Sequence, residues 1–87
     1  MNLPDWAAPD ALVYELHCTT RGYRTMKKIS TRVAHVTKDA VVLANGARYA
    51  MSELSATPPP ATFHRDDPDS ASRYFLLVGP DDPRSES

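Results

Sequence analysis

Hydrophobic and polar residues alternate with a period of two along much of this chain, and this pattern is typical of β-strands. The first such segment spans residues 11–20. We expect its apolar face to point inward, and that face consists of Leu12, Tyr14, Leu16 and Cys18. The opposite face carries Glu15 and His17, which we expect to meet water. A second alternating segment, Met26 to Arg32, favours a strand over a helix because of its Ser, Thr and β-branched residues.

Residues 33–51 carry the clearest turn signals, at Lys38-Asp39 and at Asn45-Gly46. An Asn-Gly dipeptide favours a two-residue type I′ hairpin, because both central residues take positive φ. The predicted pairs are Val42 with Tyr49, Leu43 with Arg48, Val41 with Ala50, His35 with Val42 and Val36 with Val41. Both faces of this three-stranded unit are apolar, so we expect the sheet to curl on itself.

The remaining segments complete a single small domain at residues 11–79. Ser52-Glu53-Leu54 predicts one short helical turn, and Arg73–Val78 predicts a buried last strand that ends before Gly79-Pro80. Residues 55–72 predict a long Pro-rich loop around Pro58-Pro59-Pro60. We expect residues 1–10 to form an extended lead-in and residues 80–87 a disordered acidic tail. Trp6 is predicted to dock on the body and close the core, and the alternative is an exposed partner anchor.

The fold class is therefore mainly β, with about five short strands. The strand and turn spacing of residues 11–54 and 73–78, with the Asn45-Gly46 hairpin followed by Ser52-Glu53-Leu54, resembles SH3-like small β-barrels. The resemblance concerns architecture alone, because the aromatic peptide-binding signature of signalling SH3 domains is missing. An open five-stranded oligonucleotide-binding barrel is the alternative. The chain also resembles small proteins of bacteriophages that infect GC-rich actinobacteria, which implies a host or virion protein as its partner.

Charge is distributed unevenly over the 87 residues, although the net charge is −1. Residues 1–20 carry three acids and no cation, and residues 52–87 carry seven acids and three arginines. Residues 21–51 carry seven cations against Asp39 alone. Such a split favours an anionic partner for the basic middle, or terminal segments that fold back against it.

Candidate catalytic and metal-binding residues are sparse. His17, Cys18 and His35 are possible ligands, but adjacent strand positions point to opposite faces and no ligand spacing typical of zinc occurs. The acidic stretch 66–69 lacks the glycine and the bidentate Glu of a calcium loop. Cys18, the only cysteine, has no indicated base and is expected to be a buried thiol in a reducing compartment. We therefore expect no metal, no cofactor and no enzymatic activity.

The basic middle is the remaining candidate for function. Its predicted binding residues are Arg21, Tyr23, Arg24, Lys27, Lys28, Arg32 and Arg48. A non-enzymatic module that binds a protein partner through an exposed strand edge is our first expectation. Self-association through that edge is a variant, and single-stranded nucleic acid bound by the basic loop 21–32 is the alternative. No segment predicts a membrane span, and a cytoplasmic protein is expected.

Overall fold

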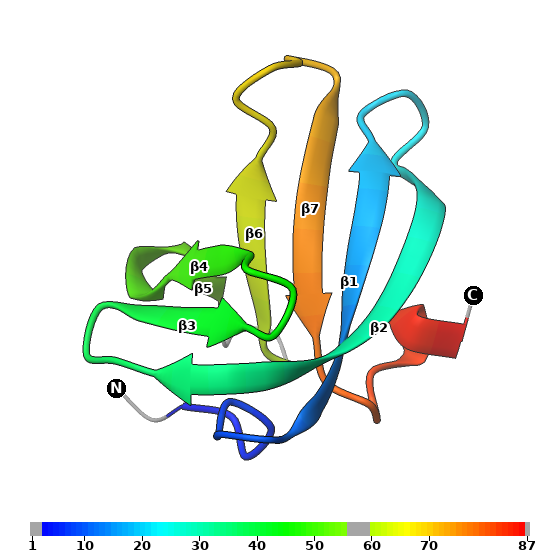
Figure 1. The fold of residues 1–87 in the computed structure, drawn as a ribbon. Helices are drawn as coiled ribbons and strands as arrows, with labels where there is room; N and C mark the ends of the chain where they lie inside the picture. The colour runs from blue at the N-terminus through cyan, green and yellow to red at the C-terminus, as the bar shows by residue number, and fades with distance from the viewer. Residues whose placement is uncertain (1–2, 56–59, 87) are drawn as a thin grey trace.

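The computed structural model describes residues 3–55 and 60–86, which form an antiparallel sheet of seven strands in the order β4-β3-β2-β1-β7-β6-β5 (Figure 1). The strands are β1 Leu12–Thr19, β2 Arg24–Val36, β3 Ala40–Leu43, β4 Arg48–Ala50, β5 Leu54–Ser55, β6 Thr62–Asp66 and β7 Arg73–Val78. Two 3-10 turns, η1 Met51–Glu53 and η2 Pro83–Glu86, complete the fold. Because η1 joins the two edge strands β4 and β5, the sheet forms a small, nearly closed barrel.

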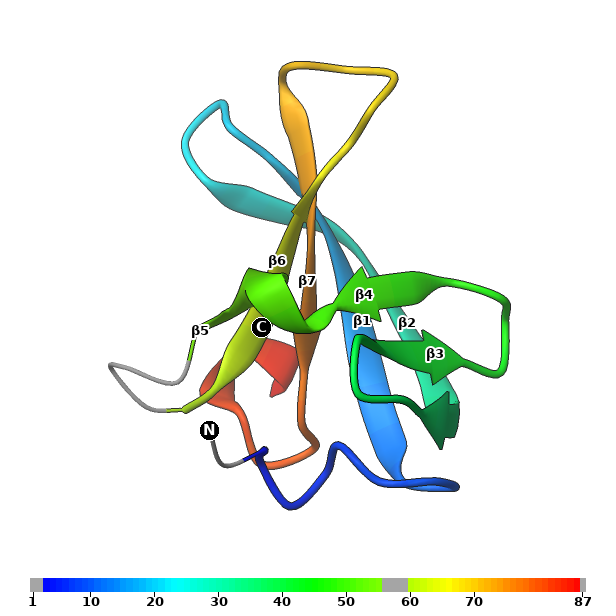
Figure 2. The same ribbon diagram turned by 90° about the vertical axis from the view of Figure 1, so that its left-hand side faces the viewer.

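Strand β2 belongs to both halves of the molecule. Its first nine residues, 24–32, run alongside β1, and its end pairs with β3 through Val33, His35 and Val36. Figure 1 shows the sharp bend between these two parts. Figure 2 shows that the β3–β4 hairpin covers only the lower part of the sheet. The upper parts of β2, β1, β7 and β6 therefore form an open four-stranded sheet above the nearly closed barrel.

The main core lies between the lower sheet and the β3–β4 hairpin. Its fully or almost fully buried side chains are Val13, Val33, Val41, Leu43, Tyr49, Phe63 and Leu77. Full burial of one such side chain contributes about 1.5–3 kcal/mol. Trp6 packs against this core with its ring 5.9 Å from that of Phe63, so the predicted docking of Trp6 is confirmed.

A second apolar cluster lies on the outer face of the sheet and contains the buried residues Leu16, Cys18 and Val78. Figure 2 shows η2 and the β3–β4 hairpin on opposite sides of β1 and β7. Just before η2, Asp82 is buried, and its carboxylate accepts hydrogen bonds from Arg84 Nε and Nη2 at 3.0 and 2.6 Å. The structure describes residues 80–86, with η2 among them, and the disorder expected for residues 80–87 stays a prediction.

The predicted faces of the first strand need correction. Val13 and Glu15 point into the main core, while Leu16 and Cys18 point into the outer cluster. Glu15 is only 4% exposed, so the expectation that it meets water is wrong. Both faces of β1 are covered because the hairpin packs on one side and Tyr14, Tyr74 and Leu76 border the other.

The turn at Asn45-Gly46 is a three-residue connection and not the predicted type I′ turn. Gly46 takes φ +91°, and its N–H donates to Leu43 O, while Leu43 N–H donates to Ala47 O. This arrangement is a type I turn followed by a left-handed glycine. It shifts the register by one residue, so Val41 lies opposite Tyr49 and Val42 opposite Arg48. The predicted pairs of His35 with Val42 and Val36 with Val41 are confirmed.

The number of strands and the long loop also differ from expectation. Strand β6 lies inside the predicted loop 55–72 and pairs with β7 along its whole length. The short strand β5 pairs with β6 through Leu54 and Ser55. Residues 56–59, which include Pro58 and Pro59, lie outside the described residues. The helical turn is observed as η1, and the last strand has the predicted bounds. No helix in the described ranges is long and apolar enough to cross a membrane.

Candidate binding groove

The open upper sheet presents one concave face, and its side chains are arranged in cross-strand rows. The row nearest the barrel crosses the sheet from β2 to β6. Its members, in the order β2, β1, β7 and β6, are Lys27, His17, Phe75 and Arg65. One row higher, Thr19 of β1 lies between Arg24 of β2 and Arg73 of β7. Cross-strand partners share a face, so the two rows line one continuous surface.

A β-bulge decides which cations reach this surface. Arg24 and Lys27 are three residues apart, so in a regular strand they would point to opposite faces. The pairing of β1 with β2 shifts between His17 and Cys18, which leaves Met26 as the extra residue of β2. The extra residue reverses the alternation, so Arg24 and Lys27 lie on the same concave face.

These side chains border a groove of about 690 Å³, lined by residues of the concave face and of the two loops above it. Its charged residues are Arg21, Arg24, Lys27 and Arg73 against Asp67. The two loops are tied together because Thr20 N–H donates to Ser72 O at 2.9 Å. The groove is therefore a basic surface held between the β1–β2 and β6–β7 loops.

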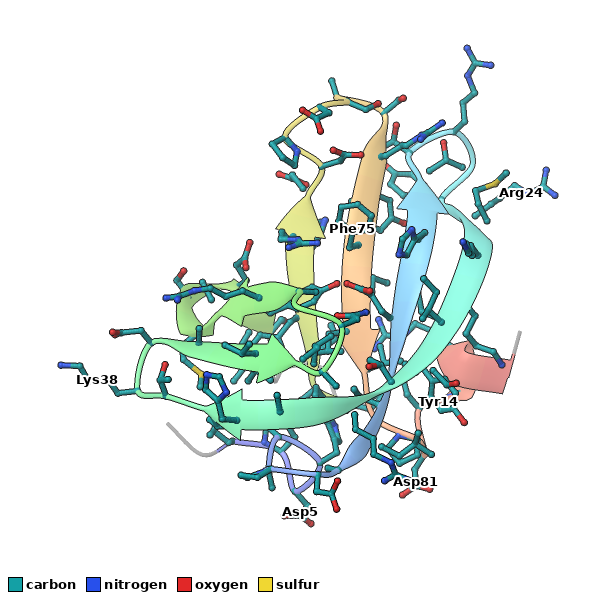
Figure 3. All side chains as sticks on the ribbon, viewed as in Figure 1. Asp5, Tyr14, Arg24, Lys38, Phe75 and Asp81 are labelled. Atoms are coloured by element: carbon teal, nitrogen blue, oxygen red, sulfur yellow. The ribbon has the colours of Figure 1, made fainter. Side chains whose placement is uncertain are left out.

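The floor of the groove is formed by His17 and Phe75, whose rings meet edge to face with centroids 4.8 Å apart. The Arg65 guanidinium lies on the other side of Phe75, 4.8 Å from the ring centroid, and equally close to the ring of Tyr49. Figure 3 shows Phe75 on the upper part of β7, above the β3–β4 hairpin. Both cross-strand neighbours of Phe75, His17 and Arg65, therefore contact its ring.

Below the floor, the buried Glu15 carboxylate connects the sheet to the hairpin. Tyr49 Oη donates to Glu15 Oε2 at 2.6 Å, and Asn45 Nδ2 donates to Oε1 at 3.3 Å. Arg65 Nη2 lies 3.9 Å from Oε2, and His17 Nε2 lies 3.7 Å from Oε1. Burial, followed by the hydrogen bond to Glu15, raises the pKa of Tyr49 far above its ordinary value, so the phenol stays protonated.

Arg65 also bridges the gap at which the barrel is not closed by strand pairing. Its Nη1 donates to the main-chain oxygen of Arg48 in β4 at 3.2 Å. Its Nε is buried and has no hydrogen-bond partner within the described residues. The flanking rings of Tyr49 and Phe75 replace some of the lost hydration by cation–π contact.

The structure brings together three of the seven predicted binding residues, Arg21, Arg24 and Lys27. Tyr23 lies at the loop tip and is 80% exposed, without lining the groove. Lys28 points to the outer face, with Nζ 5.2 Å from the ring centroid of Tyr14. Arg32 donates to the main-chain oxygen of Asp10, and Arg48 lies on β4. The predicted set is thus divided among different surfaces.

Eight groove residues were not among the predicted binding residues, and His17, Met26, Arg73 and Phe75 are four of them. The pairing of β1 with β7 places two of them beside the basic loop, although 53 or more residues separate Arg73 and Phe75 from Thr20 in the chain. Alternation along each strand could indicate their faces, but the order of the strands could not be read locally. Within the described residues, no group of three or more His, Cys, Asp or Glu side chains is placed to hold a metal ion.

One edge of the open sheet borders the groove. Strand β2 pairs with β1 on one side, and β3 reaches the other side only from Val33 onward. Between Arg24 and Thr31, no strand of the described chain pairs with that other side. We refer to Arg24–Thr31 as the open edge of β2. Its first five residues are all exposed, and Met26 is 69% exposed.

Comparison with known proteins identifies no relative: no protein-family model, no curated protein and no solved structure matches this chain.

Proposed function

We propose that this protein is a non-enzymatic binding module that holds an acidic, extended segment of a protein partner in the basic groove. The observation that carries the proposal is the grouping of Arg21, Arg24, Lys27 and Arg73 around one concavity beside an open strand edge. Clustered cations around a concave surface attract and orient anionic partners. An SH3-like topology and a bacteriophage origin, with a host or virion protein as partner, are further parts of this proposal.

A protein partner fits the groove better than a nucleic acid does. Single-stranded nucleic acids need aromatic faces on which bases can stack, and the Phe75 ring is already contacted by Arg65 and His17. Asp67 lines the groove, and Asp66 and Asp69 lie in the same part of the chain. A phosphate chain carries a charge at every nucleotide and is repelled there, whereas a peptide can place its acids at chosen positions.

Single-stranded nucleic acid remains the second candidate, supported by one observation. Tyr23 is 80% exposed in the loop between Arg21 and Arg24, where a base could stack while phosphates contact the two arginines. This alternative places the ligand at the loop tip, and the protein-partner proposal places it in the groove.

Fluorescence anisotropy with three labelled probes distinguishes these functions. The probes are an eight-residue peptide of alternating Glu and Val, its Gln analogue, and an oligothymidylate. We expect the Glu peptide to bind, the Gln peptide to bind at least about tenfold more weakly, and binding to weaken with salt. Binding of the oligothymidylate alone would overturn the protein-partner proposal in favour of nucleic acid. Failure of all three probes at low salt would overturn both.

A pair of double variants tests the location. Arg24→Glu with Lys27→Glu reverses two groove cations, and we expect at least about tenfold weaker binding of the Glu peptide. Lys38→Glu with Arg48→Glu makes the same change in net charge outside the groove, and Figure 3 shows Lys38 far from Arg24. We expect the control to change the affinity less than about threefold. Equal losses in both variants would place the binding outside the groove.

A further inference from the structure

We propose that the open edge of β2 takes up an acidic strand of the partner, so that the sheet gains an eighth strand beside the groove. This inference rests on the function proposed above and adds how the partner is held. The open edge is eight residues long, which is enough to pair with a strand of average length.

The main chain of β2 presents hydrogen-bonding groups along this edge. Val33 N–H donates to Ala11 O, so the main chain of Val33 turns toward β1. Arg32 O accepts from Ala44 N–H, so the main chain of Arg32 turns to the opposite side. These directions alternate along an antiparallel strand, and the pairing of β2 with β1 is regular from Arg32 to Lys27. Ser30 therefore directs its N–H and C=O toward the open side.

The side chains at this edge define the chemistry of the incoming strand. Arg24 and Lys27 lie at the edge and on the concave face, so they would be cross-strand neighbours of side chains on the same face of an added strand. Opposite charges at such positions stabilise strand pairing. Met26 is exposed beside them and offers an apolar contact. The matching partner is a strand with acidic residues at every second position and apolar residues between them.

The same charges exclude a second copy of this chain as the occupant. If the open edges of two copies paired antiparallel about their centres, the Lys27 side chains of both would be brought together, and each Arg24 would lie at an end of the same short ladder. Like charges on neighbouring strands destabilise pairing, and edge cations are a common protection against self-association. Charge complementarity thus selects an acidic strand of another protein.

N-methylated peptides test strand addition directly. In an added strand, every second amide faces β2 and the others face solvent. We compare two forms of the alternating Glu-Val peptide, methylated either at the odd or at the even amides. One form is expected to lose at least about tenfold in affinity, because its hydrogen bonds to β2 are blocked. The other form is expected to stay within about threefold of the parent peptide.

A variant of β2 provides the matching test from the protein side. Ser30→Pro removes the outward N–H, and proline is tolerated at an edge position whose N–H faces solvent. We expect Ser30→Pro to bind the unmethylated Glu-Val peptide at least about tenfold more weakly than the wild type does. Ser30→Ala keeps the N–H and is expected to bind like the wild type. Emission from Trp6 and the urea midpoint of each variant report whether the barrel remains folded.

The outcomes separate this inference from the function on which it rests. If both methylated peptides bind like the parent and Arg24→Glu with Lys27→Glu still abolishes binding, strand addition is wrong and the basic groove remains the site. If none of the peptides binds, the proposed function fails as well. Sedimentation at low salt that shows a dimer formed through the open edge would also overturn strand addition, because a second copy would then be the occupant.

Discussion

At the scale of single residues, Glu15 shows how a charged side chain is accommodated inside a small barrel. An isolated carboxylate in an apolar interior is strongly destabilising unless it is hydrogen-bonded or paired. Glu15 accepts hydrogen bonds from Tyr49 and Asn45, and its Oε2 lies 3.9 Å from Arg65 Nη2. Because two of these partners belong to the β3–β4 hairpin, the carboxylate also fixes the hairpin on the sheet.

The first prediction concerns Tyr49→Phe, which removes the hydrogen bond to Glu15 while keeping the aromatic ring. We expect a loss of about 1–3 kcal/mol in the free energy of unfolding near neutral pH, because a buried acceptor loses its closest donor. Urea unfolding measures this loss. Tyr23→Phe is the control, since Tyr23 is 80% exposed, and it should leave the urea midpoint unchanged.

The same variant makes a prediction about alkaline pH. Burial and the hydrogen bond to Glu15 raise the pKa of Tyr49 in the folded protein above its ordinary value of 10.0. The stability that Tyr49 contributes is therefore complete below about pH 10 and is lost as the pH rises further, because the unfolded chain loses the proton first. Stability above that pH should fall less steeply in Tyr49→Phe than in the wild type or Tyr23→Phe. Parallel curves would contradict the prediction.

At the scale of elements, contacts between segments explain the positions of small residues. A side chain at Gly79 would place its Cβ 2.2 Å from Trp6 Cδ1 and 2.6 Å from Nε1. The close approach of β7 to the N-terminal segment therefore requires glycine at this position. Gly46 has a different reason: its φ is +91°, and nothing lies within 4 Å of the position that a Cβ would take there.

We therefore predict that Gly79→Ala displaces Trp6 from the core. Trp6 is the only tryptophan, so its emission should shift to longer wavelength as the indole meets water. The free energy of unfolding should also fall by about 1–3 kcal/mol, because this is the usual effect of inserting a methyl group into a well-packed site. Gly46→Ala is the control: backbone strain should lower its stability by about 1 kcal/mol without moving the emission. An unshifted Gly79→Ala spectrum would contradict the predicted clash.

The elements that the sequence pattern predicted well are those with local signals. The bounds of β7 follow from an apolar run that ends at Gly79-Pro80, and the register between β2 and β3 follows from a short polar turn. Strand β6, with the sequence Thr-Phe-His-Arg-Asp, has only one buried residue, Phe63. Its strand conformation depends on pairing with β7, which no local pattern indicates. The predicted register of the β3–β4 hairpin is wrong because the connection has three residues, one more than the two-residue turn that Asn-Gly predicts.

At the scale of the whole molecule, the basic groove arises from strand order and one bulge. The cations Arg21, Arg24 and Lys27 were predicted from a basic stretch of sequence, but their separation from Lys28, Arg32 and Arg48 was not. That separation depends on the bulge beside His17 and on the bend of β2. Arg73 and Phe75 join the site only through the pairing of β1 with β7. This pairing depends on how the two apolar clusters pack against the two faces of β1, and no local sequence pattern indicates that.

The charges on the open edge also predict the oligomeric state. We expect a monomer in sedimentation velocity at low salt, because Arg24 and Lys27 repel a second open edge. Arg24→Ser with Lys27→Ser should form dimers, while Lys38→Ser with Arg48→Ser should not. Screening at about 1 M salt should promote self-association of the wild type. Dimers of equal strength in both double variants would show that edge repulsion is not the cause.

The bend of β2 also gives one strand two regimes of amide hydrogen exchange. The Val33 amide is bonded to Ala11 and should exchange only when the barrel opens. The outward amide of Ser30, three residues earlier, should exchange in the native state almost as fast as in a peptide. Before the bend, the amides of β2 that face the open edge would therefore take up deuterium quickly, while those that face β1 would be protected. A partner strand seated on the edge would slow Ser30 and leave Val33 unchanged, so isotope labelling reports occupancy without any attached dye.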